Sequence, residues 1–176
     1  MTGVQTCALP ILVDVGTGSG AIAVTLALEM GCTVAATEIS WAALEVAREN
    51  ARRLKAPVRL IRCDLMAALA DGSASLVVSN PPYVAEPEIA RLEPEVRAWE
   101  PRLALSGGGA GLDFYARLIG EAVRVLRPGG WLVLELGAGQ AEAVRQMLGG
   151  RWRQVRFCED LAGRLRVVVA QLEEAR

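Results

Sequence analysis

The sequence contains no histidine among its 176 residues, and this absence removes several common kinds of chemistry. Histidine is the most frequent general base and the usual partner of a serine or cysteine nucleophile. It is also a principal zinc ligand, and the four cysteines are widely spaced with no Cys-x-x-Cys pair. The composition therefore speaks against a zinc site and against Ser-His or Cys-His catalysis, and any reaction must proceed without imidazole.

Long apolar runs and an excess of one charge are missing as well. Hydrophobic residues make up 52% of the chain, yet no uninterrupted apolar run approaches the ~20 residues that a membrane-spanning helix needs. The net charge is −1, so there is no global attraction to nucleic acid or to membranes. The length favours one domain. We expect a monomeric, cytoplasmic protein with no membrane contact and no direct binding of nucleic acid.

Apolar runs alternate with longer helical patterns along the chain, which is typical of an α/β fold with a doubly wound, mostly parallel sheet. Seven strands are predicted, and the last two form an antiparallel C-terminal pair: residues 9–15, 33–37, 57–63, 73–79, 131–136, 151–158 and 164–172. Helices are predicted over residues 19–30, 40–54, 112–126 and 138–148. Residues 80–111 are expected to be irregular and to contact a substrate, because long loops inside a domain are usually functional.

The segment Asn80-Pro81-Pro82-Tyr83 directly follows the predicted strand over residues 73–79. Both prolines have a fixed φ, and the residue before a proline is kept out of the helical region. A rigid turn therefore carries an Asn amide and an aromatic ring. Such a turn can orient a planar, uncharged nitrogen group, with Asn80 and the Pro81 carbonyl accepting its two N–H bonds and Tyr83 stacking on its face.

A glycine-rich turn, Gly16-Thr17-Gly18-Ser19-Gly20, joins the first predicted strand to the first helix. Glycines let the backbone approach a ligand closely beside a helix N-terminus. Glu38 ends the next apolar run and can accept hydrogen bonds from a ribose. This spacing also fits the dinucleotide-binding fingerprint. Asp14 argues against a dinucleotide, since a carboxylate beside the turn repels a pyrophosphate but suits an ammonium group.

Four polar residues, Asp14, Glu38, Asp64 and Asn80, each fall at or just beyond the end of a predicted strand. Ligands of open α/β sheets bind outside the carboxyl ends of the strands, so we expect one shared site there. Each carboxylate also has a local alternative. Asp14 can bond the amides of the turn, Glu38 can sit at a helix N-terminus, and Asp64 can cap a short helix after it.

Together these motifs resemble an S-adenosylmethionine-dependent methyltransferase. Three further segments are similar to the HemK/PrmC family, which methylates the side-chain amide of glutamine in peptide chain release factors: Glu100-Pro101-Arg102, Gly111-Leu112-Asp113-Phe114-Tyr115 and Asp160-Leu161-Ala162-Gly163-Arg164. The resemblance covers residues 11–172. It implies a Rossmann-like class I methyltransferase fold, S-adenosylmethionine as cofactor, and methyl transfer to the glutamine of the release factor's Gly-Gly-Gln motif.

The resemblance also implies a role for each residue of the site. Gly16, Thr17, Gly18, Ser19 and Gly20 wrap the methionine part of the cofactor, Asp14 supports its ammonium group, Glu38 takes the ribose hydroxyls, and Asp64 and Leu65 flank the adenine. Asn80 contacts cofactor and substrate, and the substrate is held by Asn80, Pro81, Pro82 and Tyr83. Of these, Asn80, Pro81 and Tyr83 are implied to be catalytic.

The family normally carries a small helical domain ahead of the catalytic one, and the resemblance leads us to expect a chain that lacks it. Residues 1–10 lack the features of a signal peptide and match nothing in the family pattern, so we interpret them as a foreign leader joined to a methyltransferase domain over residues 11–176.

Other functions stay open at this point. A ribosomal protein glutamine is an alternative acceptor. The adenine amino group of DNA or RNA fits the same proline-rich turn, but it calls for a basic strip that the sequence does not show. A nicotinamide-dependent oxidoreductase and a chain that binds cofactor without transferring a methyl group are further readings.

Overall fold

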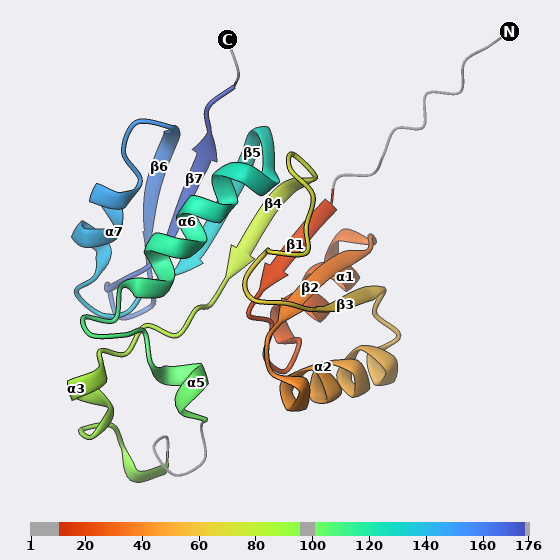
Figure 1. Ribbon diagram of the computed structural model, residues 1–176, viewed down its shortest axis with the longest axis horizontal. Coiled ribbons are helices and arrows are strands. Elements are labelled where there is room, and N and C mark those ends of the chain that lie inside the picture. Colours follow the sequence, from red (N-terminus) through yellow and green to blue (C-terminus); the bar gives the residue numbers. More distant parts are fainter. Residues whose placement is uncertain (1–10, 96–100, 175–176) are drawn as a thin grey trace, which may run out of the picture.

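A computed structural model of the chain describes residues 11–95 and 101–174. The predicted leader, residues 1–10, and Glu100 lie outside the described residues. Seven strands form one sheet in the order β3-β2-β1-β4-β5-β7-β6 (Figure 1). Their bounds are β1 Ile11–Val15, β2 Val34–Glu38, β3 Val58–Arg62, β4 Ala74–Ser79, β5 Leu126–Glu135, β6 Trp152–Glu159 and β7 Leu165–Leu172.

The direction of the strands confirms the predicted mixed sheet. The pairs β1·β2, β2·β3, β1·β4 and β4·β5 are parallel, whereas β7 runs antiparallel to both β5 and β6. Strand order reverses at β1, which has β2 on one side and β4 on the other. Ligands of open α/β sheets bind at such a switch point, outside the carboxyl ends of the strands.

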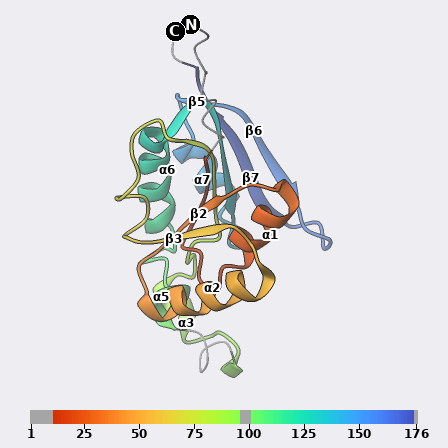
Figure 2. The same cartoon turned by 90° about the vertical axis from the view of Figure 1, so that its right-hand side faces the viewer.

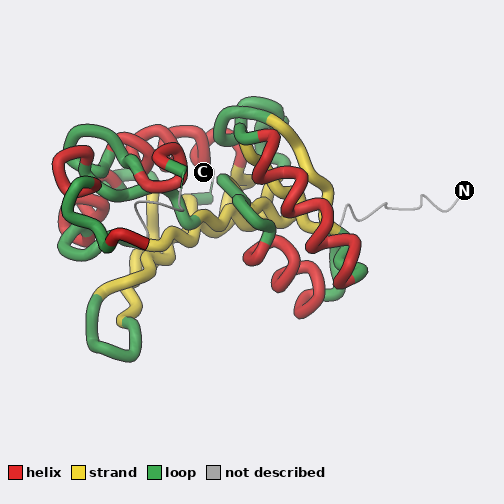
Figure 3. The backbone as a smooth tube through the Cα atoms, turned by 90° about the horizontal axis from the view of Figure 1, so that it is seen from below, coloured by secondary structure: helices red, strands yellow, loops and turns green. Residues whose placement is uncertain are grey.

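Helices cover both faces of this sheet (Figures 2 and 3). Helices α1 (Ala21–Met30) and α2 (Trp41–Leu54) follow β1 and β2, and helices α6 (Asp113–Val125) and α7 (Ala141–Met147) follow the later strands. The larger core packs buried side chains of α6 and α7 against the sheet, and a smaller core lies under α1. No helix within the described ranges is long and apolar enough to cross a membrane.

Two regions differ from the prediction. The segment expected to be irregular includes, in its described part, the short helices α3 (Glu86–Ile89) and α5 (Arg102–Leu105), which are too short for a helical period to show in the sequence. Strand β5 begins at Leu126 instead of residue 131. Ala74 pairs with Leu126 while Leu76 pairs with Trp131, so the residues between them form an irregularity within the strand.

Candidate active site

A cleft of ≈ 400 Å³ lies at the carboxyl ends of β1 to β4. It is lined by residues from the glycine-rich turn, the ends of β2, β3 and β4, and helices α5 and α6: Gly16, Thr17, Gly18, Ser19, Ala21, Ile22, Thr37, Glu38, Ile39, Ser40, Ala43, Cys63, Asp64, Leu65, Asn80, Pro82, Pro101, Leu103, Ala104 and Phe114. Most of the predicted site residues are therefore brought together. Four of them, Asp14, Gly20, Pro81 and Tyr83, are not among the residues that line the cleft.

The glycine-rich turn leaves open space at two positions that line the cleft. Gly16 and Gly18 have φ of +66° and +55°, and a Cβ added at either would meet no protein atom within 4 Å. A ligand can therefore approach the backbone here. Gly20 serves packing instead, because a Cβ there would lie 3.1 Å from the Cβ of Ala47 on α2. The side-chain amide of Asn50, also on α2, donates a hydrogen bond of 2.9 Å to the Ser19 carbonyl.

Asp14 lies on β1 beneath this turn and is only 1% exposed. Its Oδ2 accepts hydrogen bonds from the Thr17 hydroxyl at 2.6 Å and from the Ala23 amide at 3.0 Å. Its Oδ1 is buried and has no hydrogen-bond partner among the described residues. One oxygen thus fixes the turn to the start of α1, through a hydroxyl and a helix amide and not through the turn amides of the local alternative, and the other is left for a cationic group.

Burial raises the pKa of Asp14 from 3.8 to about 6, although the hydrogen bonds from Thr17 and Ala23 favour the charged form. Because the pKa is higher in the folded state, the folded protein holds this proton more tightly than the unfolded chain does. The stability from protonated Asp14 is present at low pH and is lost as pH rises through about 6. We expect the free energy of unfolding to fall by roughly 1–1.5 kcal/mol between pH 5 and 7 from this group.

Urea unfolding of the wild-type protein and of Asp14→Asn at pH 5, 6 and 7 measures this contribution. Histidine is the side chain whose ordinary pKa falls in this pH window, and the chain contains none. No histidine titration will therefore be superimposed on that of Asp14. The asparagine variant should lose the fall in stability. An equal fall in both proteins would show that Asp14 does not titrate in this range.

Glu38 at the end of β2 links the glycine-rich turn to the start of α2. Its Oε1 accepts hydrogen bonds of 2.8 Å from the amides of Ile39 and Ser40, and its Oε2 accepts one of 3.1 Å from the Gly18 amide. Oε2 therefore keeps a free acceptor direction at the cleft. This geometry combines the local role at a helix N-terminus with capacity for a ligand hydroxyl.

The loop after β3 is held by α6, which the sequence did not indicate. The Asp64 carboxylate pairs with Arg117 at 2.6 Å, and both side chains are about half exposed, 49% and 48%. Asp64 uses its side chain for this ion pair and not as a helix cap. The Met66 amide donates to Glu121 at 3.0 Å, and Arg124 donates to the Met66 carbonyl at 3.0 Å.

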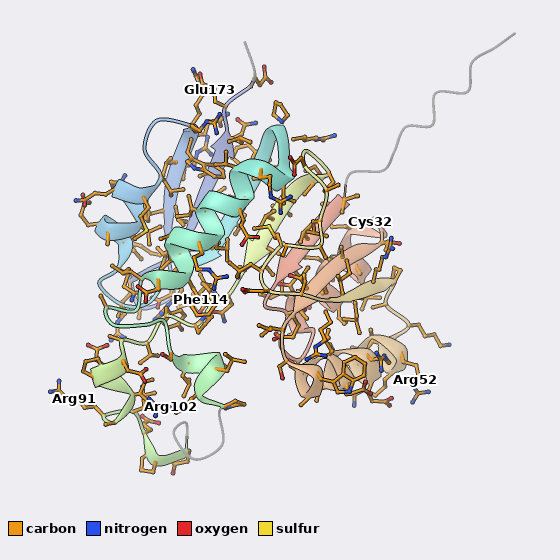
Figure 4. All side chains as sticks on the ribbon, viewed as in Figure 1. Cys32, Arg52, Arg91, Arg102, Phe114 and Glu173 are labelled. Atoms are coloured by element: carbon orange, nitrogen blue, oxygen red, sulfur yellow. The ribbon has the colours of Figure 1, made fainter. Side chains whose placement is uncertain are left out.

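These contacts hold Leu65 in an unfavourable backbone conformation. Its φ is +44°, in the left-handed region that residues with a side chain rarely adopt. Such strain persists only where the surroundings fix it, and it occurs often at ligand sites. Phe114, at the start of α6, also lines the cleft, and Figure 4 shows it at the lower end of α6. Phe114 adds an aromatic surface to the cleft that Leu65 lines as well.

The turn after β4 presents its polar groups at the cleft. The Ser79 hydroxyl donates a hydrogen bond of 2.7 Å to the Val15 carbonyl, which fixes the start of the turn to β1. Asn80 is exposed and lines the cleft, followed by a buried Pro81 and a partly buried Pro82. Within the described ranges, neither the Asn80 amide nor the Pro81 carbonyl takes part in a hydrogen bond. Asn80 is therefore available to a ligand in the cleft, whereas the buried Pro81 does not line it.

Tyr83 points elsewhere. Its hydroxyl donates a hydrogen bond of 3.2 Å to Glu135 at the end of β5, and its ring packs against the larger core. Burial, and then the nearby Glu135 carboxylate, raise the pKa of Tyr83, so the phenol stays protonated. The predicted stacking of Tyr83 on a substrate therefore stays a prediction, and the present geometry gives the ring a supporting role behind the turn.

Helix α5 forms the side of the cleft opposite the glycine-rich turn. Pro101 and Leu103 line the cleft, and Leu103 is 56% exposed. Arg102 forms an ion pair with Glu86 of α3, which fastens the two short helices together, and Figure 4 shows Arg102 between them. The Glu-Pro-Arg segment thus reaches the site through its proline, while its arginine stabilises the surrounding segment.

Comparisons with known proteins agree with this geometry. The methyltransferase small domain family matches residues 6–93. The release factor glutamine methyltransferase of Geobacter sulfurreducens is 44% identical over 149 residues, which cover 84% of this chain and 51% of that protein. The protein of the same name from Cereibacter sphaeroides is 47% identical over 167 residues, which cover 93% of this chain and 60% of that protein. The chain thus spans only about half to three fifths of the length of these relatives.

Among solved structures, a methyltransferase from Pyrococcus furiosus superimposes with a TM-score of 0.71 at 21% identity, covering 94% of this chain and 75% of that one. At this identity the likeness concerns the fold alone, and it confirms the predicted class I methyltransferase architecture. The matched half of the sequence, the strand order and the cleft at the switch point lead to one conclusion: the chain belongs to the methyltransferase small domain family.

Proposed function

We propose that this chain transfers the methyl group of S-adenosylmethionine to the side-chain amide nitrogen of the glutamine in the Gly-Gly-Gln motif of peptide chain release factors. The observation that carries this proposal is the turn after β4. It places two acceptors that have no hydrogen-bond partner among the described residues, the Asn80 amide oxygen and the Pro81 carbonyl, on a rigid segment beside the cleft. The names of the similar relatives support the same acceptor.

The residues present fit S-adenosylmethionine. The open space beside Gly16 and Gly18 can take the methionine part, and the unpartnered Oδ1 of Asp14 offers a negative charge for its ammonium group. Glu38 retains an acceptor direction for the ribose hydroxyls. Leu65 and Phe114 give the adenine ring an apolar place to pack.

When bound, the cofactor supplies a methyl group on a positively charged sulfur that is already activated. The task left to the protein is to orient a poor nucleophile, because the lone pair of an amide nitrogen is delocalised into its carbonyl. If Asn80 and the Pro81 carbonyl accept both N–H hydrogens, they aim the nitrogen and favour a pyramidal geometry. With the cofactor bound, the nitrogen held by Asn80 and the Pro81 carbonyl would take the methyl group as the carbon–sulfur bond breaks, and its acidic N–H proton would pass to water. No histidine base is needed.

Labelled methyl transfer tests the proposal. The chain and radiolabelled S-adenosylmethionine are incubated with an intact bacterial release factor, and in parallel with one whose Gly-Gly-Gln glutamine is replaced by alanine. We expect label on the intact factor alone. A ribosomal protein preparation and an adenine-containing oligonucleotide serve as competing acceptors, and label on either of these in place of the release factor would reject the proposed acceptor.

Since release factors work in the cytoplasm, the proposal places this protein there, acting as a monomer.

A further inference from the structure

Gln140, the residue that precedes α7, joins three loops at the carboxyl edge of the sheet. Its Nε2 donates hydrogen bonds to the Tyr83 carbonyl at 2.9 Å and to the Gly111 carbonyl at 3.2 Å. Its Oε1 accepts a hydrogen bond of 3.1 Å from the Gly137 amide. Two carbonyls on one side and one amide on the other determine which end of the side chain is nitrogen. Both N–H groups of the Gln140 amide are therefore used to hold backbone.

The bonded carbonyl of Tyr83 lies two residues beyond Pro81, one of the proposed acceptors. Pro81 and Pro82 have fixed φ, so the segment between Asn80 and Tyr83 has few ways to absorb a shift at one end. The other end is already fixed, because the Ser79 hydroxyl bonds to β1. A displacement of the Tyr83 carbonyl would thus be passed along the stiff segment to the acceptors.

The packing around Gln140 is tight. A Cβ built on Gly111 would lie 2.4 Å from the Tyr83 carbonyl oxygen and 2.7 Å from Nε2 of Gln140. A Cβ built on Gly137 would lie 2.4 Å from Oε1 of Gln140 and 2.9 Å from the Tyr83 ring. The two glycines leave room for the Gln140 amide and for little else, which indicates a specific contact and not a loose surface interaction.

From these contacts we infer that Gln140 is a positioning residue, which sets the orientation of the Asn80-Pro81 acceptors through the Tyr83 carbonyl. It does not line the cleft itself. The inference rests on the proposed function for its effect on catalysis, whereas its effect on the turn can be measured without any acceptor.

The test compares Gln140→Glu with Gln171→Glu. Gln140→Glu removes both N–H donors and keeps an oxygen for the Gly137 amide. Gln171 on β7 is a matched control, because its Nε2 also donates to a backbone carbonyl, that of Gly129, at 2.9 Å, and its Oε1 also accepts a hydrogen bond. It pairs with Trp131 in the middle of β5, and neither residue lines the cleft. Three quantities are measured for the wild-type protein and for each variant: kcat for labelled methyl transfer, Kd for S-adenosylhomocysteine, and the rates of amide hydrogen exchange.

We expect Gln140→Glu to lower kcat by roughly 10- to 100-fold, because small misplacements of reacting groups have effects of this size. The Kd for S-adenosylhomocysteine should stay within about twofold of the wild-type value. Exchange should be faster at the amides of Val84 and Gly107, which hydrogen-bond to Leu105 and Val84. Gln171→Glu should change neither kcat nor these amides. Unchanged exchange and unchanged kcat in Gln140→Glu, or an equal loss in both variants, would overturn the inference. If the wild-type chain transfers no label, the proposed function fails, and the exchange data decide on Gln140 alone.

Discussion

Replacement of Asn80 by alanine is expected to lower kcat for methyl transfer by about 100- to 1000-fold, the range found when one preorganised hydrogen-bonding group is removed from an active site. The Asn80 side chain has no partner among the described residues, so the folded protein loses no internal contact. Surface changes of this kind usually alter stability by less than about 0.5 kcal/mol. The loss should therefore appear in kcat while the thermal midpoint stays close to that of the wild-type protein.

Isothermal titration with S-adenosylhomocysteine separates the two roles implied for Asn80. We expect its Kd to stay within a few fold in Asn80→Ala, because the glycine-rich turn and Glu38 remain intact. Asn80→Asp is the matched variant, since it keeps an acceptor oxygen at the same place, and it should retain more transfer than the alanine variant. A large loss of cofactor affinity in Asn80→Ala would count against its role as the amide acceptor.

The sequence was sufficient for the sheet and for the edge where the site lies. Strand ends could be located because apolar runs stop at residues that break a strand, such as Gly16 and Pro81. Because the carboxyl ends of parallel strands lie at one edge of the sheet, polar residues at those ends come close together. Glu38, Asp64 and Asn80 do line one cleft. Asp14, Gly20, Pro81 and Tyr83 do not line the cleft, but each lies within a few residues of one that does, and their predicted roles stay predictions.

Other parts of the site could not be read from the sequence, because they depend on contacts between distant segments. Phe114 falls in a segment that resembles the family, but neither it nor Gln140 carries a local pattern that indicates its contacts in the fold. Gln140 bonds to Tyr83, 57 residues away, and Arg124 reaches Met66 across 58 residues. Tyr83 follows a rigid turn, and no local pattern indicated that its hydroxyl would donate a hydrogen bond to Glu135 on β5. The direction in which such a side chain points depends on tertiary packing, and the local pattern of strands and turns in the sequence carries no information about that packing.

Gly111→Ala is expected to have the largest effect on stability. Gly111 has φ of +74°, where a side chain costs about 1–2 kcal/mol. Its new Cβ would also lie 2.4 Å from the Tyr83 carbonyl oxygen, a backbone atom that Gln140 holds in place. Overpacking adds about 1–3 kcal/mol. We therefore expect the free energy of unfolding to fall by about 2–5 kcal/mol, and the thermal midpoint by roughly 4–20 °C for a chain of this size.

Gly109→Ala is the control for this substitution, two residues away in the same loop. Gly109 has no positive φ, and a Cβ there would meet nothing within 4 Å. Its replacement should leave the thermal midpoint unchanged or slightly higher, because alanine restricts the unfolded chain more than glycine does. Differential scanning calorimetry of the three proteins gives the comparison. Equal midpoints for Gly111→Ala and Gly109→Ala would mean that the turn after β4 can move away from Gly111 at little cost. The rigidity on which the orientation of Asn80 and the Pro81 carbonyl depends would then have to come from the two prolines alone.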